Sequence, residues 1–191
     1  MQAAATTLRL VTEPPGEVEK LFRAHHDRVF RTAHRITGSA EDAEDVLQTV
    51  FLRLVRSDES YDLSQNPEAY LSRAAINASL DLLRSRTRAR LVAVDDTDVN
   101  ALPSGFRSPE TEHADRELHQ LIRRAVATLG KTAGEMFVLR YYEGYDNQEI
   151  ARLLDTSQTV VGVVLHRART KLRKEIGHYM EKHQNDAGSG L

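Results

Sequence analysis

Two clusters of basic side chains have a spacing suited to binding phosphate groups. The first cluster has four arginines within seven residues: Arg84, Arg86, Arg88 and Arg90. The second has five cations within eight residues: Arg167, Arg169, Lys171, Arg173 and Lys174. Acidic blocks at 41–45 and 95–98 oppose them, so the net charge of −2 conceals faces of opposite sign. The alternative for either cluster is an ordinary solvated helix surface.

The second basic cluster follows a helix-turn-helix pattern. Residues 148–154 read as a short helix, 155–157 as a turn, and a long helix starts near Gln158. Ala151 is small enough to let the two helices cross closely. The side chains expected to meet across the joint are Ile150, Leu154, Val161 and Val164. The pattern predicts a module whose second helix ends in cations that can bind phosphates.

Apolar residues recur at helical spacing along most of the chain, and no segment reads as a strand. Helices are expected at 17–37, 39–56, 67–90, 112–129, 132–143, 147–154 and 158–180. Four start signals support these limits. They are capping boxes at Ser39–Asp42, Thr132–Glu135 and Asp146–Glu149, and the pair Asn66-Pro67. The fold class predicted is all-α.

A change in composition divides the 191 residues into two small helical domains. Residues 95–111 are rich in Asp, Pro, Ser and Gly, which is typical of a flexible linker. The predicted organisation is a flexible arm at 1–15, a three- or four-helix bundle at 16–91, a linker at 92–111, a helix-turn-helix domain at 112–180 and a flexible tail at 181–191. We expect the domains to pack together through the acidic linker and the basic helices, which would mask DNA-binding surface.

Absent residue types and motifs argue against an enzyme. The chain has no cysteine, so it has neither a thiolate zinc site nor a cysteine nucleophile. It has eight histidines but no HExxH pattern, and it lacks a glycine-rich phosphate loop. We therefore expect no catalytic residues, no metal and no cofactor. The sequence has no apolar run of about 18 residues and no secretory signal, so we expect no membrane insertion and a cytoplasmic protein.

Several motifs in order resemble the extracytoplasmic-function (ECF) group of sigma-70-type sigma factors of bacterial RNA polymerase. The resemblance covers about residues 17–90 and 112–176. The segments that carry it are Gly38–Arg53, Pro67–Arg84, Phe137–Gly144, Glu149–Ala151 and Leu165–Arg169. It implies a first domain equivalent to sigma region two and a second equivalent to region four. It also implies three partners, namely RNA polymerase core, promoter DNA and an anti-sigma factor.

The resemblance implies a site for core polymerase on the second helix. The matching positions are Asp42, Asp45, Gln48 and Phe51. Acids beside exposed apolar side chains suit a basic helical partner. The alternative is that Phe51 and Leu47 are only part of the bundle core.

The resemblance also implies that the third helix and the loop before it bind the unpaired minus-ten promoter element. Arg73 and Asn77 could bind a base edge and Tyr61 could stack on a base, while cations hold the backbone. Those cations are Arg84, Arg86 and Arg88. The alternatives are that Asn77 satisfies groups inside the bundle and that Tyr61 covers its core.

The helix starting near Gln158 is implied to enter the major groove of the minus-thirty-five element. Base contacts fall to Gln158, Thr159, His166 and Arg167, and phosphate contacts to Arg169 and Lys171. The sequence departs from the family at 162–164, where Gly-Val-Val replaces the usual polar residues. The valines could contact thymine methyl groups, leave recognition to DNA shape, belong to the core, or be covered by an anti-sigma factor.

These features predict a sigma factor that binds core polymerase, recognises promoter DNA and assists its melting. The alternative is a helix-turn-helix transcriptional regulator that acts without core polymerase. Co-purification with core polymerase separates the two.

Overall fold

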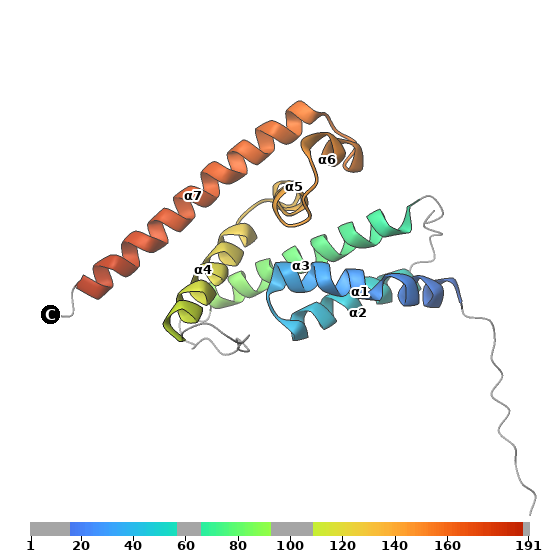
Figure 1. Cartoon of the computed structure of the whole chain (residues 1–191), viewed down its shortest axis with the longest axis horizontal. Coiled ribbons are helices and arrows are strands. Elements are labelled where there is room, and N and C mark those ends of the chain that lie inside the picture. The colour runs from blue at the N-terminus through green and yellow to red at the C-terminus, as the bar shows by residue number, and fades with distance from the viewer. Residues whose placement is uncertain (1–15, 57–65, 93–108, 189–191) are drawn as a thin grey trace, which may run out of the picture.

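The computed structural model describes residues 16–56, 66–92 and 109–188, and all their regular structure is helical (Figure 1). This confirms the all-α prediction. The helices are α1 (Glu17–Thr37), α2 (Ala40–Arg56), α3 (Pro67–Val92), α4 (Pro109–Ala127), α5 (Lys131–Tyr141), α6 (Asn147–Leu153) and α7 (Gln158–Gly188). The predicted arm at 1–15, the loop holding Tyr61, and residues 93–108 of the linker lie outside the described residues.

Helices α1, α2 and α3 form an N-terminal bundle around one apolar core. Its fully buried side chains include Val29, Ala33, Ala43, Leu71 and Ala75. The helix α1 ends at Gly38, whose backbone has φ of +72° and whose N–H donates to the His34 carbonyl at 2.8 Å. A glycine fits this left-handed position because it has no Cβ. The tight turn that results brings α2 back alongside α1.

Helices α4 to α7 form a C-terminal module that contains the predicted helix-turn-helix. The Asp146–Glu149 capping box at the start of α6 is present, with bonds of 2.8 and 2.7 Å. The turn before α7 places Asp155 at φ of +49°. The side chains expected to meet across the joint do so: Ile150, Ala151 and Val161 are buried there, with Leu154 and Val164 packed against them.

Several details differ from the sequence predictions. The Ser39–Asp42 capping box is only half formed, because the Asp42 N–H donates to Ser39 Oγ at 3.3 Å while the Asp42 carboxylate binds Arg86. The Thr132–Glu135 capping box is wrong, because α5 is preceded by Gly130, which makes no side-chain cap, and Glu135 bonds to α3 instead. The helix α4 begins at Pro109 rather than near 112. The helix α7 runs to Gly188 rather than ending at Met180, which replaces most of the predicted tail with helix.

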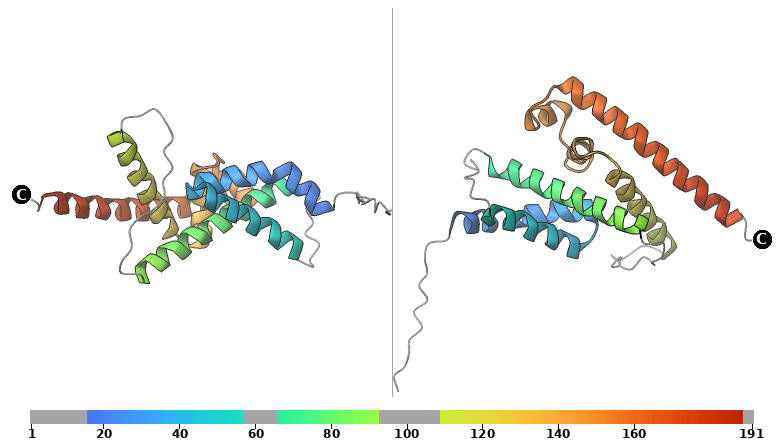
Figure 2. Two further views of the ribbon diagram at one scale, coloured as in Figure 1. Left: turned by 90° about the horizontal axis from the view of Figure 1, so that it is seen from below. Right: turned by 180° about the vertical axis from the view of Figure 1, so that it is seen from behind.

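The two modules pack against each other and share a second apolar core. Helix α5 lies between α3 and α7 in Figure 1 and in the right-hand view of Figure 2. From the N-terminal bundle this core takes Ile36, Ile76, Leu80 and Leu83, and from the C-terminal module it takes Leu129, Met136 and Leu139 among others. The domains therefore pack together as predicted, while the acidic linker that was expected to take part lies outside the described residues. The packing is made largely by apolar side chains and not by charge alone.

Candidate nucleic-acid and polymerase interfaces

The α3 side chains predicted to contact a minus-ten base are engaged by the C-terminal module. Arg73 Nε donates to Glu135 Oε1 at 2.9 Å, and Arg73 Nη1 donates to the Leu153 carbonyl at 3.1 Å. Asn77 Nδ2 donates to the same Glu135 oxygen at 3.2 Å. Asn77 Oδ1 is buried and finds no hydrogen-bond partner among the described residues. The structure thus brings Arg73 and Asn77 together, around an acidic group from the other module.

The arginines after Asn77 have separate environments. Arg84 is largely buried and donates to the Leu129 carbonyl at 3.3 Å and to Asp81 at 2.9 Å. Arg86 binds both carboxylate oxygens of Asp42. Arg88 is exposed. Of the three predicted phosphate-binding arginines, Arg88 and the exposed half of Arg86 face solvent in this arrangement.

The predicted core-polymerase residues divide between two sides of α2. Asp42 is only 2% exposed, and burial raises the pKa of its carboxyl above the ordinary value, an effect partly offset by Arg86. Phe51 is buried edge-to-face against Phe22, with ring centroids 5.0 Å apart. Asp45 and Gln48 are exposed. The alternative that Phe51 belongs to the bundle core is therefore what the structure shows.

Two apolar side chains complete the exposed side of α2 and were not identified from the sequence. Leu52 is 47% exposed and Val55 is 64% exposed. They continue the three- and four-residue spacing of Asp45 and Gln48, so they share that face of the helix. This spacing in the sequence could have predicted that Leu52 and Val55 lie on the same face as Asp45 and Gln48.

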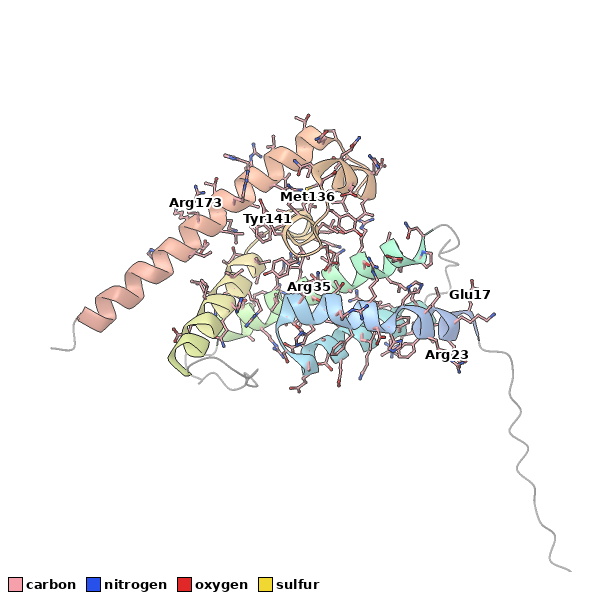
Figure 3. All side chains as sticks on the ribbon, viewed as in Figure 1. Glu17, Arg23, Arg35, Met136, Tyr141 and Arg173 are labelled. Atoms are coloured by element: carbon pink, nitrogen blue, oxygen red, sulfur yellow. The ribbon has the colours of Figure 1, made fainter. Side chains whose placement is uncertain are left out.

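The predicted minus-thirty-five residues line the outside of α7. Exposed side chains there are Gln158, Thr159, His166, Arg167 and Arg169. Lys171 is also exposed, and its Nζ donates to the Thr128 carbonyl at 2.6 Å. Figure 3 shows Arg173 on the outer side of the same helix. One helix thus presents polar groups near its start and cations further along.

Further polar contacts between the modules involve residues that were not predicted to join them. Arg35 Nη1 donates to the Tyr142 carbonyl at 2.6 Å and lies 3.3 Å from Glu143 Oε1. Figure 3 shows Arg35 on the side of α1 nearest α5. Arg123 packs against Gly38, and burial lowers the pKa of Arg123 and raises the pKa of Tyr142. Such contacts depend on tertiary packing and leave no local sequence pattern.

Two segments of the chain match known protein families. Residues 21–89 match the family Sigma-70 region 2, and residues 119–172 match Sigma-70, region 4. The ECF RNA polymerase sigma factor SigE of Mycolicibacterium smegmatis is 33% identical over 88% of this chain, which spans 63% of that protein. The RNA polymerase sigma-E factor of Streptomyces coelicolor is 30% identical over 84% of this chain and 86% of its own length.

The chain belongs to the ECF sigma factors. Its N-terminal bundle is sigma region 2 and its C-terminal module is region 4. A solved structure of the sigma factor RpoE with the anti-sigma factor NepR from Bartonella quintana is also similar, with a TM-score of 0.49 and 18% identity over 83% of this chain and 95% of that one. As an ECF sigma factor, the protein has an RNA polymerase sigma factor's role in transcription initiation.

The described part of this sigma factor has no candidate metal site and no candidate membrane-spanning helix. Within it, no group of three or more His, Asp or Glu side chains is placed to hold a metal ion. None of its described helices is both long and apolar enough to cross a membrane.

Proposed function

We propose that this sigma factor binds RNA polymerase core through the exposed side of α2 and promoter DNA through α7 and α3. One observation carries the proposal: a single chain presents an acidic and apolar helix face on region 2 and a cation-rich recognition helix on region 4. The function is that of a binding factor in the cytoplasm and needs no catalytic residue. We also propose that an anti-sigma factor is its regulatory partner.

The polymerase-binding surface in this proposal consists of Asp45, Gln48, Leu52 and Val55. Their combination of negative charge and exposed aliphatic groups suits a basic helical surface on the polymerase. Asp42 acts indirectly, because it is buried and fixes Arg86. Phe51 supports the helix from beneath by packing on Phe22.

A charge reversal on α2 tests this surface. We expect Asp45→Arg to weaken binding to purified core polymerase at least tenfold, because it sets a cation against a basic partner. The matched control is Glu175→Arg, which makes the same charge change at an exposed position of α7. Equal binding by the two variants, measured by fluorescence titration without DNA, would place the polymerase site elsewhere.

Promoter melting in this proposal requires the contact between the modules to open. Glu135 occupies Arg73 and Asn77, the groups that would bind an unpaired base. An unpaired strand can use them only after the carboxylate leaves. Binding to core polymerase and DNA would therefore favour an open form in which region 4 has moved off α3.

A run-off transcription assay with purified core polymerase and a promoter library tests the whole function. The expected result is transcripts that start at defined promoters and require the added chain. Tight promoter binding by the chain alone, with no effect on core polymerase, would instead indicate a helix-turn-helix regulator.

A further inference from the structure

The valines at the start of α7 fall into two groups. Val161 is fully buried and Val164 packs against the same core, so these two pack the helix onto its module. Val160 and Val163 are each 45% exposed and lie outside that core. The unusual apolar run is therefore only partly explained by packing. Two of its side chains are left to solvent on the outer face of the recognition helix.

These two valines lie where a recognition helix meets base edges. Residues 160, 163 and 167 are three and four apart, so they share one face, and Arg167 lies about 10 Å along the helix from Val160. In a helix-turn-helix the first residues of the second helix contact the bases. Thr159, His166 and Arg167 are exposed on neighbouring positions and supply polar groups around the valines. Val160 and Val163 are thus surrounded by polar and charged side chains that can bind DNA.

Only one apolar group is displayed in the major groove, the 5-methyl of thymine. We infer that Val160 and Val163 recognise thymine methyl groups in the upstream promoter element, an inference that rests on the function proposed above. The valines also discriminate against other bases. A guanine O6 or N7 or a cytosine amino group beneath them would lose its water without gaining a hydrogen bond.

Replacing thymine by deoxyuridine tests the inference, because it removes the 5-methyl and leaves every hydrogen-bonding group in place. The holoenzyme is formed from core polymerase and the full chain. Its promoter DNA then carries the replacement at one upstream position at a time. We expect about a fourfold loss of affinity at each thymine that a valine contacts, the effect of one buried methyl group.

Variants of the chain link each methyl group to a valine. Val160→Ala and Val163→Ala should each abolish the deoxyuridine effect at one position and leave the others intact. Alanine favours the helix more than valine does, so both variants should fold. The control is Leu118→Ala, which trims a side chain that is 47% exposed on α4 and should leave all the deoxyuridine effects unchanged.

The outcomes separate this inference from the proposed function. If transcription is promoter-specific but no deoxyuridine position matters, the inference is overturned and the sigma function stands. The inference also fails if the deoxyuridine effects survive in both valine variants, as they would if these side chains were covered by a protein partner. If the chain directs no promoter-specific transcription, the inference and the proposed function fail together.

Discussion

Asp42 is an acid held inside the N-terminal bundle by one guanidinium. Both of its carboxylate oxygens accept hydrogen bonds from Arg86, and the side chain is almost fully buried. Burial raises its pKa, so protonation is easier in the folded chain than in the unfolded one. The positive charge of Arg86 partly offsets this effect and stabilises the charged form of the Asp42 carboxylate.

Loss of Arg86 should destabilise the chain in a pH-dependent way. We expect Arg86→Met to lower the free energy of unfolding by about 2 kcal/mol at pH 7, because a buried carboxylate is left without its cation. The pKa of Asp42 then rises further. The loss therefore shrinks as the pH falls through that raised pKa and the carboxyl is neutralised. Urea unfolding at pH 7 and pH 5 measures the difference.

The double variant Arg86→Met/Asp42→Asn is the control for this experiment. It removes the charge together with its partner, so most of the stability at pH 7 should return. A loss that is the same at both pH values would show that Arg86 acts through packing and not through Asp42.

The sequence did not show which of the residues predicted on α2 are exposed and which are buried. The core-binding positions taken from the family mix exposed Asp45 and Gln48 with buried Asp42 and Phe51. A phenylalanine in an amphipathic helix suits a core and an interface equally well. Only its position against Phe22 decides between them.

Among the helices, the short α6 depends most on its cap. It has seven residues, too few to be stable without tertiary contacts and a good start. We expect Asp146→Ala to lower the free energy of unfolding by about 1 kcal/mol, while Asp146→Ser retains most of it. Hydrogen exchange should show α6 amides losing protection before those of α5. Equal protection in the alanine and serine variants would contradict this role.

The turn between α1 and α2 should tolerate no side chain. Gly38 has a positive φ, and a Cβ there would come within 2.5 Å of the Arg123 guanidinium. Gly38→Ala is expected to cost about 1–2 kcal/mol in unfolding free energy. Gly177→Ala is the control, because a Cβ at that helical glycine would meet nothing within 4 Å. Its thermal unfolding should occur at an equal or higher temperature.

Local start signals were predictable only where nothing distant competed for the same side chain. Asn66 accepts from the Ala69 N–H at 3.0 Å, and Asp146 and Glu149 cap α6, both as expected. Glu135 had the right spacing from Thr132 for a capping box. It binds Arg73 instead, because a guanidinium from another helix is a stronger partner than a backbone N–H.

In the whole molecule, α3 contributes side chains to two separate hydrophobic cores. Leu71, Ala75 and Ala78 face the bundle, whereas Ile76, Leu80 and Leu83 face region 4. A helix that is apolar on two sides predicts two packing partners, so this signal was present in the sequence. Which helix supplies the second partner was not predictable, because that contact joins residues far apart in the sequence.

Removing the charge of Glu135 should loosen the closed form. We expect Glu135→Gln to raise the affinity of the full chain for a single-stranded minus-ten oligonucleotide about tenfold, because Arg73 and Asn77 lose a charged competitor. Small-angle scattering should show a larger radius of gyration. Glu175→Gln, at an exposed site on α7, should change neither quantity. Unchanged oligonucleotide binding in both variants would show that Glu135 does not compete with DNA.

The shared core also bears on what happens when the chain is cut. In a fragment that stops before Pro109, the apolar side chains of Ile76, Leu80 and Leu83 would be exposed to solvent. We expect this fragment to self-associate, and analytical ultracentrifugation should detect aggregates that the intact chain does not form. An isolated region 2 fragment should therefore not reproduce the solution behaviour of the full chain.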